Sequence, residues 1–254
     1  KPVVVVGEHA LIRDAGDAIL AAANDAAHAI DAIKEDWAGF GVLHTAAGRV
    51  GALDTGFIPG EGGADTATIL GGAMDTIVLL GADEVDLSKT GNAKIIYVGS
   101  HGDAGASKAD IILPAAAYTE MAATYVNTEG RVQMTRRAVQ PKGEAREGCA
   151  IIRALSDVVG KTLPYDSADA LRESLRAQNP IFAGMGYAPG HEGAEALKEK
   201  ISASSSGNGS GVGNGRFTPA IGDFYMTNPI ARASKTMAEC SLQKQGLATP
   251  VAAE

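Results

Sequence analysis

The chain has 254 residues, of which 45% are hydrophobic and 20% are charged. This composition is typical of a globular protein with a sizeable core, either one large domain or a domain with an appendage. Nucleic acids and anionic membrane surfaces bind clustered Lys and Arg, and single strands also stack on aromatic side chains. A net charge of −8 and an aromatic content of 5% therefore predict neither partner.

The two cysteines, Cys149 and Cys240, exclude several cofactors. They are too few to hold an iron–sulfur cluster, and they lack the CxxC spacing of zinc sites and redox pairs. No apolar run approaches the ~20 residues that a membrane-spanning helix needs, and no signal peptide is visible. We therefore expect reduced thiols and no direct membrane insertion. Because the chain starts at Lys1-Pro2 without Met, we also expect a fragment or a processed product.

The first elements alternate between strand and helix. VVVVGEH at 3–9 is an apolar β-branched run ended by glycine, as in a buried parallel strand. The Ala-rich stretch at 14–33 predicts an amphipathic helix with Asp14 as its N-cap. FGVLHTAA at 40–47 predicts a second short strand, and the Gly-rich residues 51–65 predict a loop.

Three further apolar runs each end in Gly or Pro and continue into polar residues, at 75–83, 93–103 and 109–117. In the third run, the segment 111–113 predicts a buried strand that Pro114 ends. Helical stretches lie between these runs, which predicts a doubly wound α/β domain with a mostly parallel sheet, Rossmann-like in architecture.

A closing amphipathic helix is predicted at 143–161, with Gly160 as its C-cap. Its inward face is expected to carry Ile151, Ile152, Leu155, Val158 and Val159. We therefore place a Rossmann-like α/β domain at residues 1–162 and a helical, irregular C-terminal extension at 163–254.

The extension changes character along its length. The sequence predicts a helix at 163–180 capped by Asp166 or Ser167, then a loop, a short helix at 193–201, and a flexible Gly/Ser/Asn linker at about 202–216. The last part contains an apolar cluster at 224–226 and a helix with Asn228 as N-cap and Pro229 at its first position. We expect this tail to dock on its own domain or on a partner.

The usual ligand-binding motifs are missing. The turn after the first strand has Gly7 but not the further glycines of a dinucleotide fingerprint, and Glu8 would repel a phosphate. The five histidines show no metal-binding spacing. The segment 101–103, His-Gly-Asp, lies where α/β sheets bind ligands, but a hydrogen-bonded turn is favoured there, and a turn role is also favoured for Asp83 and Glu84.

The stretch at 109–133 looks like an active-site loop at the carboxyl end of a strand. Its polar residues are Thr119, Glu120, Thr124, Tyr125, Asn127, Thr128, Glu129 and Arg131. The longer segment 109–160 resembles the molybdopterin oxidoreductase superfamily. The matching positions are Leu113-Pro114-Ala115, Glu120, Thr124, Asn127-Thr128-Glu129, Arg131, Gln133 and residues 141–146.

Within that superfamily, the segments 1–21, 162–175 and DFYMTNPIARASKTMAECS at 223–241 are similar to the large iron–sulfur subunits (the G subunits) of respiratory complex I, the NADH–quinone oxidoreductase. The resemblance covers almost the whole chain, apart from the linker. It implies a parent subunit that relays electrons from NADH to quinone through 2Fe–2S and 4Fe–4S clusters, which cysteine-rich motifs bind in an N-terminal part outside this chain.

The resemblance implies that this chain is a non-catalytic structural region, with no catalytic, cofactor-binding or metal-binding residue of its own. The polar side chains at Glu120, Asn127, Glu129 and Arg131 would then hydrogen-bond the backbone and each other. The implied partners are other peripheral-arm subunits, at the cytoplasmic side of a bacterial inner membrane or the matrix side in mitochondria.

Two alternatives stay open. The chain could be a fragment of an active molybdopterin oxidoreductase, with a pterin dinucleotide near 101–103 and 119–129; the short remainder after the sheet argues against it. It could also be a nucleotide-binding module, although the Gly-rich phosphate turn is missing. A vestigial ligand site between His101 and Glu129 is compatible with each interpretation.

Overall fold

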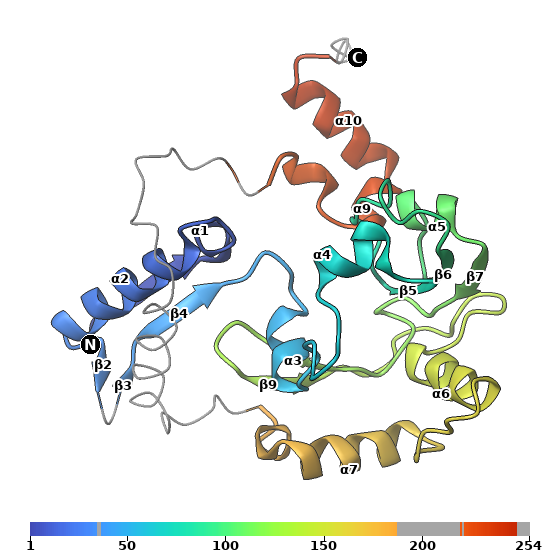
Figure 1. The fold of residues 1–254 in the computed structure, drawn as a ribbon, viewed down its shortest axis with the longest axis horizontal. Coiled ribbons are helices and arrows are strands. Elements are labelled where there is room, and N and C mark those ends of the chain that lie inside the picture. Colours follow the sequence, from blue (N-terminus) through green and yellow to red (C-terminus); the bar gives the residue numbers. More distant parts are fainter. Residues whose placement is uncertain (35–36, 187–218, 220, 248–254) are drawn as a thin grey trace. The chain divides into compact units, whose positions relative to one another are not determined.

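The computed structural model describes residues 1–34, 37–186, 219 and 221–247 (Figure 1). The predicted helix at 193–201 and the linker at 202–216 lie outside the described residues. The chain divides into two compact units. Unit 1 comprises Lys1–Phe57, Thr124–Met134 and Leu175–Ala220, and unit 2 comprises Ile58–Ala123, Thr135–Ser174 and Ile221–Glu254. The predicted division at residues 162 and 163 stays a prediction.

Unit 1 is built on a pair of parallel strands, in which Val4 pairs with Phe40 and Gly7 with Leu43. The paired strands are β1 (Val4–Gly7) and β4 (Phe40–Leu43). The other elements are α1 (Glu8–Leu11), α2 (Gly16–Ala29), β2 (Ile33–Lys34), β3 (Trp37–Ala38), α3 (Arg49–Asp54), β8 (Thr124–Val126), β9 (Val132–Met134) and η2 (Pro180–Ala183). β2 pairs with β3, and β8 with β9, in antiparallel fashion.

Helix α2 begins later than the sequence suggested. Its N-cap is Ala15, without a side-chain cap, so the prediction that Asp14 caps it was wrong. The reason is a tight turn between α1 and α2, in which a Cβ on Gly16 would overlap the carbonyl oxygen of Leu11. Only glycine allows this approach, and it sets the point where α2 starts. The predicted loop at 51–65 is also partly helical, because α3 extends to Asp54.

Unit 1 has two small hydrophobic clusters. One joins Ala27, Ala32 and Ile33 to the partly buried Val4 and Phe40, and so packs α2 beside β1 and β4. The other packs the β8–β9 hairpin against α3 and η2, through Val126, Val132 and Phe182 with Val50, Leu175 and Ile181 around them.

Unit 2 contains a three-stranded parallel sheet in the order β5-β6-β7. Its strands are β5 (Thr76–Leu80), β6 (Lys94–Gly99) and β7 (Ile111–Pro114). The helices are α4 (Thr66–Thr68), η1 (Ile69–Ala73), α5 (Ala104–Lys108), α6 (Gly148–Val158), η3 (Phe224–Met226), α9 (Pro229–Arg232) and α10 (Lys235–Lys244). Helix α7 (Ala168–Gln178) starts in unit 2 and ends in unit 1.

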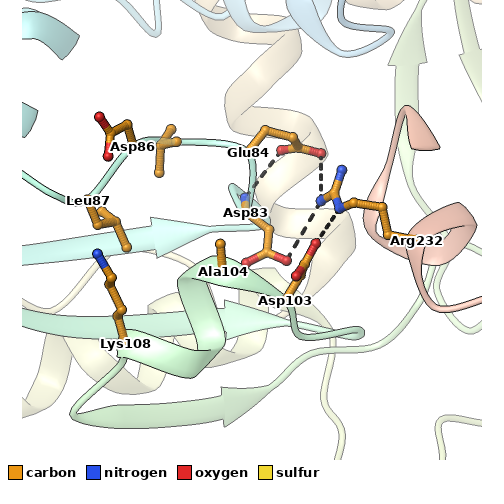
Figure 2. Close-up of a pocket in the computed structure, with 9 residues that line it drawn as sticks. Asp83, Glu84, Asp86, Leu87, Asp103, Ala104, Lys108 and Arg232 are labelled. Carbon is orange, nitrogen blue, oxygen red and sulfur yellow. Dashed lines mark hydrogen bonds and ion pairs between the residues drawn. The ribbon is translucent and has the colours of Figure 1, made fainter. Parts of the chain in front are cut away.

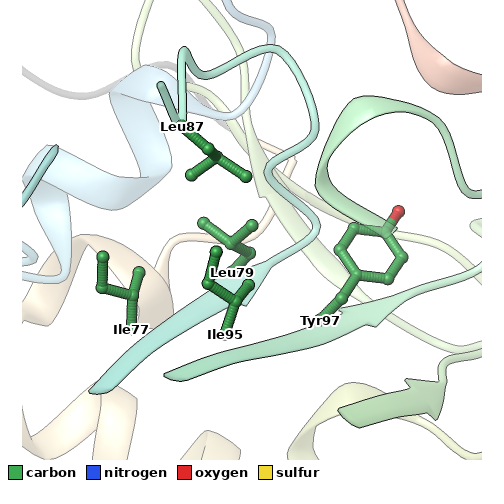
Figure 3. Packing of buried hydrophobic residues seen from close by; sticks show 5 residues of the cluster. All are labelled: Ile77, Leu79, Leu87, Ile95 and Tyr97. Carbon is green, nitrogen blue, oxygen red and sulfur yellow. The ribbon is translucent and has the colours of Figure 1, made fainter. Parts of the chain in front are cut away.

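The core of unit 2 lies on one face of this sheet (Figure 3). It consists of Ile77, Leu79, Leu87, Ile95 and Tyr97, with partly buried residues of η1 and α5 packed against it. Side chains alternate along a strand, so the neighbours Val78 and Leu80 point away from this core and are exposed.

Two predictions of burial were wrong. Ile111 and Ile112 were expected in a buried strand, but each is about half exposed, at 51% and 54%. Among the described residues β6 is the one strand that pairs with β7, which is therefore an edge strand, and on its other side the amide of Arg146 donates to the carbonyl oxygen of Pro114 at its end. Val158 and Val159 were expected to face inward, but they are the last residue of α6 and its C-cap, and both are exposed. Gly160 follows with a positive φ of 73°, as a residue just past a helix end often does.

Several local predictions are confirmed. The Ser167 hydroxyl accepts a hydrogen bond from the amide of Ala170 at the start of α7. Asn228 caps α9 and Pro229 occupies its first turn. The α/β class with mainly parallel strands is also confirmed. The parallel strands form two sheets, one in each unit, because the strands of each unit pair only with one another among the described residues.

Replacing Leu79 by Ala tests the core of unit 2. Leu79 is 4% exposed, so we expect the Leu79→Ala chain to lose about 2–5 kcal/mol of unfolding free energy from lost burial and a residual cavity. The matched control, Leu80→Ala, removes an adjacent side chain that is 54% exposed and should cost below about 1 kcal/mol. Urea unfolding followed by circular dichroism measures both values, and equal losses would contradict this packing.

Candidate functional site

A crevice lies at the carboxyl ends of β5 and β6 in unit 2 (Figure 2). Open α/β sheets bind their ligands at this kind of edge, so it is the natural place to look for a site. The crevice has a volume of about 480 Å³ and is lined by Asp83, Glu84, Val85, Asp86, Leu87, Asp103, Ala104, Lys108 and Arg232.

Asp83 is the buried anchor of the crevice, with only 1% of its surface exposed. Its Oδ1 accepts a hydrogen bond of 2.6 Å from the amide of Gly105, which ties the loop after β5 to α5. A side chain at position 105 would clash, because a Cβ there would lie 2.7 Å from this oxygen. The other oxygen, Oδ2, has no hydrogen-bond donor among the described residues. This carboxylate therefore depends on a nearby positive charge.

That charge is Arg232, which reaches the crevice from α9 in the tail (Figure 2). Its Nε donates to Asp103 Oδ2, and its Nη2 lies 3.3 Å from Glu84 Oε1 and 3.8 Å from Asp83 Oδ2. The side chain is only 20% exposed. Partial burial opposes the charge, but the hydrogen bond to Asp103 and the charge of Glu84 outweigh it and raise the pKa of Arg232. One guanidinium thus pairs with carboxylates from two strand-end loops.

Tyr97 lies under the turn that follows β6 and hydrogen-bonds to it. Its hydroxyl donates to the carbonyl oxygen of His101. Burial raises the pKa of Tyr97, and the charges of Asp83 and Glu84 raise it further, so the phenol stays a neutral donor. The turn predicted at 101–103 is therefore hydrogen-bonded, and its last residue, Asp103, lines the crevice.

The sequence-predicted residues meet only in part. Asp83, Glu84 and Asp103 come together at the crevice. Besides the turn role predicted for it, Asp83 faces Arg232 in an ion pair that no sequence motif indicated. Arg232 was missed, because it lies 129 residues from Asp103 and no sequence spacing links the two. The tail was expected to dock on its own domain or on a partner, and this contact places it on unit 2.

The polar residues predicted at 119–133 are divided between the two units. In unit 2, Glu120 accepts a 3.0 Å hydrogen bond from the amide of Ala117. In unit 1, Asn127 Oδ1 accepts from the amides of Glu129 and Arg131, at 3.1 and 2.9 Å. Arg131 Nε lies 2.7 Å from Glu129 Oε1, and this hydrogen bond helps to lower the pKa of that carboxyl. The predicted hydrogen bonds to the backbone and between side chains are confirmed.

The charge of the crevice does not fit a pterin dinucleotide. Its lining carries four carboxylates, of Asp83, Glu84, Asp86 and Asp103, against two cations, Lys108 and Arg232. A pyrophosphate bound there would face excess negative charge, whereas phosphate sites present backbone amides and cations.

Two further searches of the described residues gave clear results. Within them, no three His, Cys, Asp or Glu side chains gather so that they could hold a metal ion. The helices in the same part of the chain are too short or too polar for any one of them to span a membrane.

These features define a protein of the parallel α/β class whose strand-end crevice is lined by an internal ion-pair cluster. Residues 1–158 match the family model of molybdopterin oxidoreductases. Residues 192–240 match the model of the C-terminal region of the G subunit of NADH-ubiquinone oxidoreductase. The chain belongs to the molybdopterin oxidoreductase family, and the resemblance predicted from its sequence is confirmed.

Three proteins that match nearly the whole length of the chain have related names. The chain is 40% identical over 243 residues to the NADH-ubiquinone oxidoreductase 75 kDa subunit of Reclinomonas americana, covering 95% of this chain and 34% of that protein. It is 38% identical to the mitochondrial NADH dehydrogenase [ubiquinone] iron-sulfur protein 1 of Solanum tuberosum, covering 95% and 31%. It is 36% identical to the G subunit of NADH-quinone oxidoreductase from Rickettsia bellii, covering 98% and 34%. The chain thus spans about a third of the length of these relatives.

Removing Arg232 tests the ion-pair cluster. In the Arg232→Ala chain, the buried Asp83 loses its nearest cation, so we expect the docked tail to lose about 2 kcal/mol, between the values for exposed and buried ion pairs. Hydrogen exchange of the amides in 221–247 measures this as faster exchange.

The control is Lys235→Ala, which removes an equal charge from an exposed position on the same tail. Exchange in the control should match that of the unchanged chain. If both variants exchange at the same rate, Arg232 does not hold the tail.

Proposed function

We propose that this chain is a non-catalytic structural region of the large iron–sulfur subunit of respiratory complex I. The observation that carries this proposal is the crevice at the ends of β5 and β6, where Arg232 from the tail pairs with the carboxylates of the strand-end loops. The ion pairs of Arg232 with Asp103 and Glu84 join the tail to the strand-end loops, which is a packing role.

The parent subunit in this proposal relays electrons from NADH to quinone. Its 2Fe–2S and 4Fe–4S clusters would be bound outside this chain, since Cys149 and Cys240 are too few to hold them. The names of the relatives from potato and Rickettsia support this assignment. The partners would be other subunits of the peripheral arm, at the cytoplasmic side of a bacterial membrane or the matrix side in mitochondria.

The domain division at residues 162 and 163 belongs to this proposal. The match to molybdopterin oxidoreductases ends at 158, and the match to the C-terminal region of the complex I subunit begins at 192. Both limits support an α/β domain followed by a separate C-terminal extension, whose tail docks through Arg232.

A ligand-binding domain is the second candidate, because the family match over residues 1–158 is to an oxidoreductase family that uses a pterin. The acidic lining of the crevice argues against it. Native mass spectrometry of the purified chain separates the two candidates. A mass equal to the 25.8 kDa polypeptide supports the structural role, and additional mass matching a pterin dinucleotide or a nucleotide overturns it.

The structural role predicts that a variant of this region changes the amount of assembled complex but not the turnover rate of each complex. With Arg232→Ala in the parent subunit, we expect less assembled complex I because the tail is held less firmly. The NADH:quinone activity per assembled complex should be unchanged. Native gels and activity assays on the same membranes measure both quantities, with Lys235→Ala as the control. Normal assembly with slower turnover per complex would contradict the proposal.

A further inference from the structure

Unit 1 has its own polar cluster at the carboxyl ends of its parallel strands, centred on Glu8. This residue follows β1 directly and is only 8% exposed. Its Oε2 accepts hydrogen bonds from the amide of Thr45 at 2.7 Å and from the Thr45 hydroxyl at 2.9 Å. Its Oε1 lies 2.9 Å from Arg49 Nη1. The carboxylate is therefore held by the turn after β4 and by α3.

The groups around Glu8 are those that bind an oxyanion. A backbone amide, a hydroxyl and a guanidinium donate to its two oxygens, as they do to bound phosphates and carboxylates. His44 adds a ring nitrogen, Nδ1, which lies 3.8 Å from Oε2. This nitrogen is buried and has no hydrogen-bond partner among the described residues, so a further donor or acceptor is available beside the carboxylate.

The ionisation of Glu8 agrees with this interpretation. Burial is the largest influence and would raise the pKa of the carboxyl. The hydrogen bonds from Thr45 and the charge of Arg49 outweigh it, so the pKa lies below its ordinary value of 4.5. The donors thus stabilise a negative charge in a place that water reaches poorly.

We propose that the carboxyl ends of β1 and β4 form an oxyanion site that the chain occupies with its own Glu8. The site is built for a carboxylate or phosphate group, and the tethered carboxylate excludes any such group from solution. A tethered group has a high effective concentration, so a free anion competes poorly with it. This inference stands on unit 1 alone and goes beyond the structural role proposed above.

The Glu8→Ala chain tests the site, because the substitution removes a group the size of acetate and leaves the donors in place. We expect this chain to melt at a lower temperature than the unchanged chain. Added sodium acetate should restore the melting temperature in a saturable way, as a ligand that binds only the folded state does. Inorganic phosphate at equal ionic strength is the second probe, and the more effective of the two assigns the class of anion.

Two controls make the test specific. In Glu8→Gln, the neutral amide fills the space of the carboxylate. Acetate and phosphate should therefore change the melting temperature of Glu8→Gln no more than they change that of the unchanged chain. The double variant Glu8→Ala, Arg49→Ala also lacks the main cation of the site. The concentration of acetate or phosphate needed for the same rise in melting temperature should then increase at least about tenfold.

The proposal is overturned if acetate and phosphate shift the unchanged chain, Glu8→Gln and Glu8→Ala equally, or shift none of them. If Glu8→Ala does not fold in chloride, its refolding is compared in acetate and in phosphate at equal ionic strength. Folding in either anion supports the site, and failure in both overturns it. These melting experiments use the isolated chain, so their result is independent of whether Arg232 affects the assembly of complex I.

Discussion

Parallel strand pairing is the constraint on which both units depend. Because β5 and β6 run in the same direction, their carboxyl ends meet at one edge and bring Asp83, Glu84 and Asp103 together. Carboxylates placed this close repel one another, and the buried one cannot be solvated by water. Arg232 supplies a positive charge to these carboxylates from the tail, so the strand-end loops and α9 stabilise each other.

The tail is organised to deliver that arginine. Asp223 caps η3 and also accepts from the Ser241 hydroxyl of α10, so the two helices brace each other. Asn228 caps α9, and the carbonyl oxygen of Met226 accepts from Arg232 Nη1. These contacts fix the backbone and the guanidinium of the docked tail beside the crevice.

Much of the local structure follows from the sequence. The strands at 75–83 and 93–103, the cap at Ser167 and the start of α9 depend on residues that are neighbours in the chain, and all were predictable. The exposure of Ile111 was not, because an apolar run looks the same in a central and in an edge strand. The start of α2 escaped prediction for a related reason, since it depends on a close approach between two turns of backbone.

The sequence by itself determined the α/β class, the family and the acidic residues after the strands. Only the tertiary structure decided what those residues meet. Arg232 reaches Asp103 across 129 residues, and Thr45 reaches Glu8 across 37. Such pairs carry no fixed spacing, because the intervening chain can be of any length as long as the fold brings both residues together. The sequence therefore shows which residues are charged, and the fold decides which residues they pair with.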